Sequence, residues 1–131
     1  MTSLEGIQAA AFPFHGNVRP ILNEVTHALD RLLETGEATV IDLAGLPFGP
    51  GELEHLEASL GTGELSATLD ALGTSCIRET AFPGVWWLEH RNALDEVVGR
   101  YLEITRTPEI LSSQEVDIVA GRARLGDQLG N

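Results

Sequence analysis

Hydrophobic and polar residues alternate along much of the middle of the chain, between residues 64 and 105. A period of two is typical of β-strands that turn one face to a core and the other to water. The turns between the alternating runs contain glycine, proline, asparagine or aspartate, which favour turn geometry. Connections this short join antiparallel neighbours, because a parallel crossover needs about a dozen residues. We therefore predict an antiparallel meander of four strands, at residues 64–69, 75–81, 85–91 and 97–105.

Two adjacent tryptophans, Trp86 and Trp87, lie in the third predicted strand. Neighbouring residues of a strand point to opposite faces of a sheet, so at least one indole must lie away from the main core. Such an indole is either covered by another segment of the chain or in contact with a partner. The covered arrangement is favoured, and contact with a partner stays open as the alternative.

A spacing of three and four residues between apolar positions is typical of a helix, and it begins after residue 19. It predicts a first helix over residues 20–35, with Pro20 in the first turn and Gly36 just after the end. The β-branched run that follows predicts a short buried strand at residues 38–43.

A glycine-rich loop at residues 45–51 leads into a second predicted helix, at residues 50–60. A loop of this kind between a strand and a helix invites comparison with phosphate-binding loops. Here, however, the helix begins with carboxylates, which would repel a phosphate and suit the helix dipole instead: Glu52, Glu54 and Glu57. The sequence therefore argues against a phosphate site.

A third helix is expected to begin at the Thr107-Pro108-Glu109 sequence and to end or bend at Gly121. The predicted fold class is α+β: a mostly antiparallel sheet, made of the meander and one further strand, with about three helices packed on one face. We expect a flexible arm at residues 1–17, a single domain at residues 18–121 and a tail at residues 122–131.

The chain of 131 residues carries a formal net charge of -12, and all eight of its basic residues are arginines. A protein this acidic is repelled by nucleic acid and by anionic membrane surfaces. Arginine binds carboxylates in a fixed fork, which favours contacts with other proteins. No apolar run reaches the roughly 18 residues of a membrane span, and no basic leader precedes an apolar run. We predict a cytoplasmic protein that does not insert into membranes.

Few residues are candidates for chemistry: Cys76 and four histidines, His15, His27, His55 and His90. None of them has the spacing of a zinc site, and no spacing places a nucleophile beside a base. The sequence therefore predicts no enzyme, no metal site and no cofactor. The meander has six charged or titratable residues, some of which must share the polar sheet face, where opposite charges can pair across strands: Arg78, Glu79, Glu89, His90, Arg100 and Glu103.

Several strings in the meander and just after it resemble the C-terminal conserved region of the HupH/HyaF family of hydrogenase expression proteins. These strings are GELSA at 63–67, RETAFPGVWW at 78–87, LEIT at 102–105 and PEI at 108–110. The resemblance covers roughly residues 17–118, although family members are longer than this chain. It implies a non-catalytic accessory protein or chaperone in the maturation of nickel–iron uptake hydrogenases. The implied partners are the iron–sulfur small-subunit precursor before export, other hydrogenase accessory proteins, or both.

Tryptophan and arginine are the residues most enriched at binding hot spots. Our hypothesis is that five residues contribute to the partner surface: Arg78, Glu79, Trp86, Trp87 and His90. An alternative is a small-ligand or cofactor-handling domain with a pocket between sheet and helices near Cys76. A third hypothesis is a homodimer formed through edge strands and an exposed apolar patch.

Overall fold

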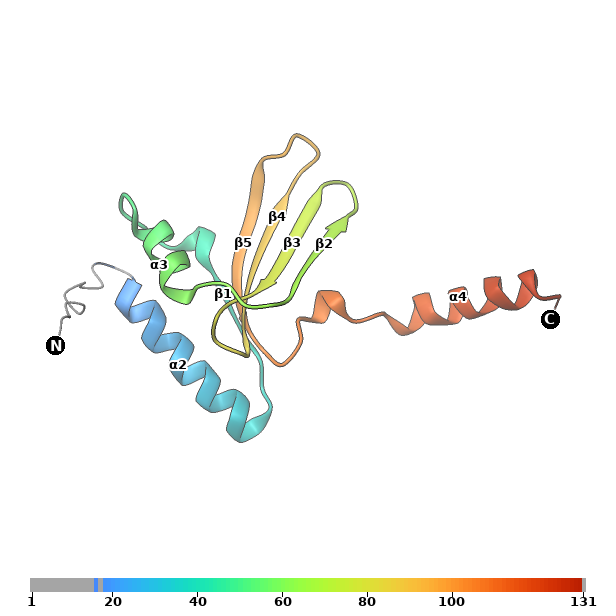
Figure 1. Cartoon of the computed structure of the whole chain (residues 1–131), viewed down its shortest axis with the longest axis horizontal. Helices are drawn as coiled ribbons and strands as arrows, with labels where there is room; N and C mark the ends of the chain where they lie inside the picture. Colours follow the sequence, from blue (N-terminus) through green and yellow to red (C-terminus); the bar gives the residue numbers. More distant parts are fainter. Residues whose placement is uncertain (1–15, 17, 131) are drawn as a thin grey trace.

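The computed structural model describes residues 16 and 18–130, so all of the predicted N-terminal arm except Gly16 lies outside the described part. Five strands form one sheet in the spatial order β1-β5-β4-β3-β2 (Figure 1). Their bounds are Thr39–Asp42 for β1, Ser66–Asp70 for β2, Thr74–Glu79 for β3, Val85–Arg91 for β4 and Val97–Ile104 for β5. Every pair of neighbours is antiparallel.

The predicted meander is confirmed, and each predicted strand agrees with the structure to within two residues at either end. The β1 strand pairs with β5, with Ile41 opposite Leu102, and so occupies the edge of the sheet away from β2. Four successive antiparallel pairings leave β1 and β2 running in the same direction at opposite edges. The tight β2–β3 turn depends on Gly73, because a Cβ at that residue would lie 2.1 Å from the Arg91 carbonyl oxygen.

The first predicted helix is confirmed as α2, Val18–Thr35, which begins two residues earlier than expected. Pro20 lies in its first turn, where the missing N–H has no helical partner to lose. Gly36 has a φ of +78° and donates its N–H to the Leu32 carbonyl oxygen at 2.9 Å, as a left-handed helix end requires.

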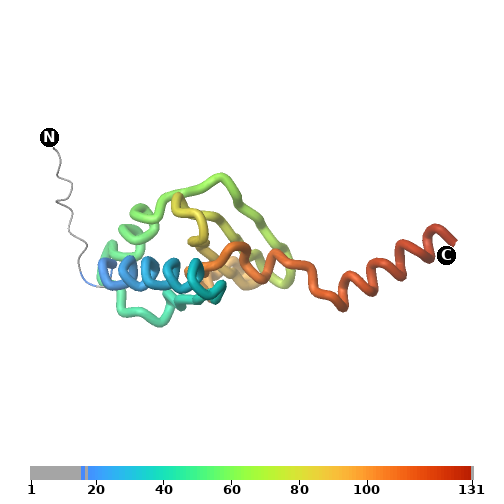
Figure 2. Tube along the Cα trace, turned by 90° about the horizontal axis from the view of Figure 1, so that it is seen from below, coloured from blue at the N-terminus to red at the C-terminus, as the bar shows by residue number. Residues whose placement is uncertain are grey.

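The second predicted helix is α3, Glu52–Leu60. The side chain of Glu52 accepts a hydrogen bond from the Gly49 N–H at 2.7 Å, which satisfies one donor of the loop before the helix. Gly61 ends the helix as predicted, with its N–H donated to the Glu57 carbonyl oxygen at 3.0 Å. Figures 1 and 2 show α2 and α3 gathered at one side of the sheet.

The two tryptophans lie on opposite faces of the sheet, as their adjacency predicted. Trp87 belongs to the main core between the sheet and the two helices, with Val85, Leu102 and Ile104. Trp86 belongs to a second, smaller cluster with Ile77 and Leu88, against which Tyr101 packs. Its Nε1 donates a hydrogen bond to the Thr105 carbonyl oxygen at 3.2 Å, which ties the indole to the segment after β5. The covered arrangement of the second tryptophan is therefore confirmed.

The third helix differs from the prediction in its bounds and in its packing. Residues Glu109–Leu111 form a short 3-10 turn, η2, and the α-helix α4 spans Glu115–Gln128 without ending at Gly121. Figures 1 and 2 show that α4 projects away from the sheet, so only two of the three helices pack on one face. The physical reason is that its apolar side chains divide between two sides of the helix and form no broad stripe for the sheet to bury. A glycine inside a helix weakens it by only about 1 kcal/mol relative to alanine.

Within residues 16 and 18–130, no helix combines the length and the apolar character that crossing a membrane requires.

Candidate functional site

One end of the sheet extends beyond α2 and α3 on the helix side, and polar side chains lie there in cross-strand rows. Leu102 and Trp87 of the main core share a row with Arg78 of β3. The next row, two residues further along each strand, consists of Thr68, Cys76, Glu89 and Arg100. With Arg78 and Arg91, these four residues make up what we call the polar sheet face. Polar side chains can lie in this row because neither α2 nor α3 covers it.

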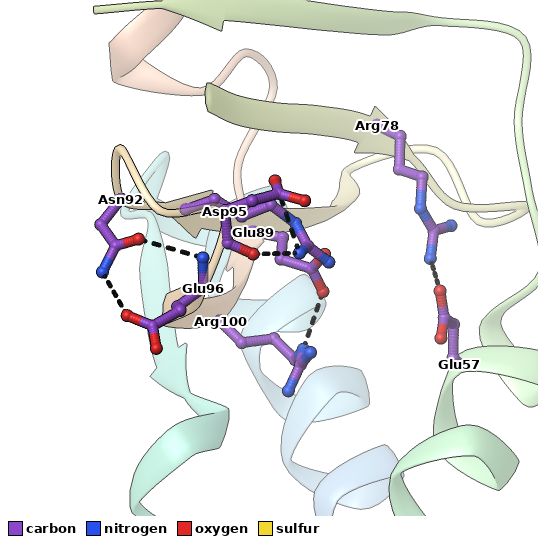
Figure 3. Close-up of polar contacts among 8 residues, drawn as sticks. Glu57, Arg78, Glu89, Asn92, Asp95, Glu96 and Arg100 are labelled. Atoms are coloured by element: carbon purple, nitrogen blue, oxygen red, sulfur yellow. Dashed lines mark hydrogen bonds and ion pairs between the residues drawn. The ribbon is translucent and has the colours of Figure 1, made fainter. Parts of the chain in front are cut away.

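The centre of the polar sheet face is an ion cluster around Glu89 (Figure 3). Arg100 donates from Nε to Glu89 Oε2 at 2.9 Å, and Arg91 donates from Nη2 to Glu89 Oε1 at 3.3 Å. Arg91 also donates from Nη1 to the Asp95 carbonyl oxygen at 3.0 Å, which ties the cluster to the β4–β5 turn. All three charged side chains are partly buried. Asp95 Oδ1 also lies 3.8 Å from Arg91 Nη1, so the cluster pairs two guanidinium groups with two carboxylates.

Arg78 lies at the boundary between the main core and the polar sheet face. Its guanidinium stacks over the Trp87 ring, 5.3 Å from the ring centroid, and forms an ion pair with Glu57 of α3 (Figure 3). A cation over an indole gains from the negative face of the ring. The same guanidinium lines an open cavity of about 450 Å³ at the end of α3, with Glu54, Glu57, Ala58, Gly61 and Thr62.

The five residues predicted for the partner surface are divided between the two faces. Arg78 and Trp87 lie opposite each other on the helix side. Glu79, Trp86 and His90 lie on the other side, where Glu79 is opposite Trp86. Trp86 is 5% exposed and Trp87 is 2% exposed, so neither indole offers its ring to a partner in this conformation. The alternation of side chains along a strand already predicted that the two tryptophans are on different faces, since residues 86 and 87 are neighbours.

The face that carries Trp86 holds a second polar group. Ser75 Oγ lies 2.7 Å from His90 Nδ1, and the His90 ring packs against Tyr101 with centroids 5.8 Å apart. Nearby, burial raises the pKa of Glu103; the charge of His90 acts in the opposite direction and that of Glu109 in the same direction. A serine–histidine contact becomes a nucleophile only when a third group orients the base. No hydrogen bond among the described residues supplies that third group at His90.

The side chain of Cys76 is exposed in the middle of the polar sheet face. It lines none of the four cavities that border the two hairpin turns, the end of α3 and the length of α2. No group of three or more histidine, cysteine, aspartate or glutamate residues in the described part of the chain is placed to hold a metal ion.

A groove of apolar character follows α2 where the β3–β4 turn approaches it. One part, of about 280 Å³, is lined by Leu22, Val25, Thr26, Leu29, Ser59, Leu60 and Phe82. A second part, of about 460 Å³, is lined by Leu29, Leu32, Leu33, Glu79, Pro83, Gly84 and Arg106. Leu29 borders both parts. The turn that forms one wall is held by Thr80, whose buried hydroxyl donates to the Val85 carbonyl oxygen at 2.9 Å and accepts from the Phe82 N–H at 3.1 Å.

Of the predicted cross-strand ion pairs, the sheet realises the one between Glu89 and Arg100. Sequence reasoning missed the part that Arg91 plays, because the strand register shifts between His90 and Arg91 and spacing alone does not assign its face. It also missed the groove along α2. The groove requires the turn at Phe82 to meet a helix about fifty residues earlier in the chain, and no local pattern reports such a contact.

Comparison with known proteins gives consistent results. The C-terminal conserved region of the HupH hydrogenase expression protein matches residues 16–131 of this chain. The hydrogenase expression/formation protein HupH of Rhizobium leguminosarum bv. viciae is 30% identical over 111 residues, which are 85% of this chain and 39% of that protein. The protein HoxQ of Azotobacter vinelandii, described in the same words, is 32% identical over 111 residues, 83% of this chain and 39% of its own length. The solved structure of hydrogenase expression protein HupH from Thiobacillus denitrificans ATCC 25259 is 49% identical with a TM-score of 0.84, and covers 88% of this chain and 96% of that one.

Proposed function

The chain belongs to the family of HupH hydrogenase expression proteins, through their C-terminal conserved region, and on this basis we propose that it assists the maturation of a hydrogenase. The chain spans about 39% of the length of the curated relatives named above. The role is that of an accessory protein that binds another protein and performs no catalysis of its own. Its partner is the small-subunit precursor of the hydrogenase, bound in the cytoplasm before export.

The observation that supports a binding role is the polar sheet face. Strands whose polar side is open to water offer a broad, ordered surface, and here that surface holds a partly buried cluster of Glu89, Arg91 and Arg100. Among the described residues Arg100 is bonded to Glu89 through Nε, and its Nη groups can donate to a carboxylate of a partner. A carboxylate that reached Arg100 would meet a guanidinium already oriented by its bond to Glu89, which lowers the entropy cost of binding.

The experiment that tests this proposal measures the affinity of the purified chain for the purified small-subunit precursor, by calorimetry or interferometry. We expect Arg100→Glu to weaken binding at least about tenfold, since the new carboxylate faces Glu89 and repels an acidic partner. The matched control is Arg19→Glu, which makes the same charge change at an exposed residue of α2 away from the polar sheet face. Thermal melting of both variants shows whether the fold is intact.

Equal affinity of the wild-type chain and a folded Arg100→Glu variant would contradict the assignment of the surface. Equal loss in the two variants would show a response to net charge alone. A second measurement concerns the partner itself, by capture from cells that express a hydrogenase operon and identification by mass spectrometry. Recovery of another accessory protein without the small-subunit precursor would show that the proposed partner is wrong. The proposed role in maturation would still stand. No contact or cavity described above favours the small-ligand alternative at Cys76.

A further inference from the structure

Two apolar surfaces have no partner within residues 16 and 18–130, and their patterns match. The first is the groove along α2, whose line of residues on the helix is Leu22, Thr26, Leu29 and Leu33. The second is one side of α4, with Ile118, Arg122 and Leu125 in the helix and Leu129 directly after its end. Both sets have the spacing i, i+4, i+7, i+11, which aligns side chains on one side of an α-helix. Helices that pack against each other bring together lines of this kind.

The apolar residues of this second set, which we call the α4 stripe, are largely exposed to solvent. Ile118, Leu125 and Leu129 are 57%, 58% and 69% exposed. Figures 1 and 2 show that α4 stands clear of the rest of the described chain. A helix of 14 residues is marginal in water when no tertiary contact supports it. Contiguous exposed apolar surface on such a helix indicates a contact that the described part of one chain does not provide.

In this conformation, α4 cannot bind in the groove of its own chain. The segment before the helix is anchored on the Trp86 side of the sheet, where Thr105 accepts the indole hydrogen bond and Pro108 is fully buried. The η2 turn then holds its backbone through the bond from the Leu111 N–H to the Pro108 carbonyl oxygen, at 3.0 Å. Only residues 112–114 remain between η2 and α4, and they reach about 11 Å at most. That reach is too short to carry a helix around the sheet edge and onto α2.

The charges beside the two stripes are complementary. Asp30 and Glu34 lie on α2 next to the line of Leu22, Thr26, Leu29 and Leu33, and both are exposed. Arg122 lies in the α4 stripe itself, and Arg106 lines the groove. Among residues 16 and 18–130, no ion pair engages Asp30, Glu34, Arg106 or Arg122. A docked α4 would bring Arg122 beside the acidic flank of α2.

We propose that the chain forms a homodimer by reciprocal exchange, in which α4 of each copy lies along α2 in the apolar groove of the other. A two-fold axis makes the two contacts identical, so one complementary pair of surfaces is used twice. The exchange leaves the polar sheet face open, because the groove lies along α2 and beside the β3–β4 turn. The inference does not depend on the function proposed above, and its test uses the purified full chain alone.

The first measurement is the mass in solution, by sedimentation equilibrium over a range of concentrations. The expected result is a species of twice the chain mass of 14.1 kDa, in equilibrium with the monomer. A monomer at all concentrations up to the millimolar range would overturn the proposal.

The second measurement compares two substitutions on α4. Leu125→Glu places a carboxylate in the docking stripe and is expected to raise the dimer dissociation constant at least about thirtyfold. Val116→Glu is the matched control, because it adds the same charge to another side of the same helix, where the residue is also exposed. This control variant is expected to remain dimeric. Equal dissociation of the two variants, or no dissociation of either, would contradict the assignment of the stripe.

The third measurement separates α4-in-groove docking from a contact between two α4 helices. Phe82→Glu changes a half-exposed residue of the groove wall and leaves α4 intact. In the exchanged dimer this variant also dissociates, and an equimolar mixture with the Leu125→Glu chain regains a heterodimer through one intact contact. If the Phe82→Glu chain stayed fully dimeric, or if the mixture stayed monomeric, the exchange would be excluded. Circular dichroism of each variant confirms that the sheet is folded.

Discussion

The two faces of the sheet each bury one tryptophan, but they do so in very different surroundings. Trp87 belongs to a cluster of thirteen buried residues contributed by α2, α3, three strands and the 3-10 turn Leu43–Gly45 after β1. Trp86 belongs to a cluster of three, with Ile77 and Leu88, and its cover includes the segment after β5 instead of a helix. The same strand therefore serves a large core and a small one. The difference predicts that equal substitutions on the two faces have unequal effects.

The comparison also explains where polar chemistry is possible. On the helix-side face, the side chains change from mostly apolar in the row of Trp87 to polar in the row of Cys76, Glu89 and Arg100. The two rows are only two residues apart along each strand. Helices α2 and α3 cover the first row and do not reach the second. On the opposite face, the polar residues Ser75, His90 and Glu103 border the small cluster directly. A meander with bulky residues on both faces thus needs a separate packing segment on each face. Its polar sites lie at the boundaries of the areas that these segments bury.

The largest effect is expected for Trp87→Ala. Removing this indole leaves a cavity in the main core and takes away the ring on which Arg78 stacks. We expect a loss of about 3–5 kcal/mol in the free energy of unfolding, measured by denaturant titration. Trp87→Phe serves as the control that keeps an aromatic ring and is expected to cost much less. A loss below about 1 kcal/mol for Trp87→Ala would contradict its place in the core.

A smaller loss is expected for Trp86→Ala, about 2–3 kcal/mol, because a cavity in a three-residue cluster can collapse or admit water more easily. Trp86→Phe isolates the hydrogen bond to the Thr105 carbonyl oxygen and should cost about 1 kcal/mol. Denaturant titration under the same conditions as for Trp87 makes the two faces directly comparable. If Trp86→Ala were as costly as Trp87→Ala, the contrast between the faces would be lost.

The smallest expected effect is a pH-dependent change in stability caused by Glu103, on the sheet face that carries Trp86. Because burial raises the pKa of Glu103, the folded state binds its proton more tightly than the unfolded state does. The folded protein is therefore favoured by this residue at low pH, and that contribution is lost as the pH rises from the ordinary value of 4.5 through the raised pKa. We expect Glu103→Gln to increase the melting temperature relative to wild type more at pH 7 than at pH 4.

The control for this comparison is Glu24→Gln, at an exposed residue of α2 on the other side of the molecule. Its melting temperature relative to wild type should change little between the two pH values. A difference for Glu103→Gln that shrinks as the pH rises would have the opposite sign to the one that burial of a carboxylate requires.

Much of the fold could be predicted because its signals are local. The alternation of residues 64–105 with their turn residues was enough to order four strands, and the apolar spacing before Gly36 was enough to place α2. The prediction failed at the C-terminal helix, which begins at Glu115 and packs on nothing within the described chain. Apolar residues were counted there without checking that they share one side of the helix.

The candidate site was predicted less well, for a physical reason. Residues were chosen by type, and tryptophan and arginine are indeed typical of interfaces. However, the type of a residue does not report its burial, and both indoles are covered. The pairing of Glu89 with Arg100 was accessible from the charges of the meander. The participation of Arg91 needed the register of β4 against β5, which includes an irregularity between His90 and Arg91.

The sequence by itself determined the strands, the first two helices and the opposite directions of Trp86 and Trp87, because backbone periodicity and turn chemistry act over a few residues. Only the tertiary structure decided where β1 pairs, how far the helices cover the sheet and which side of α4 is left exposed. Those features depend on contacts between segments that lie far apart in the chain. A helix can therefore be read from its own residues, whereas the surface that it covers, or leaves uncovered, depends on the whole fold.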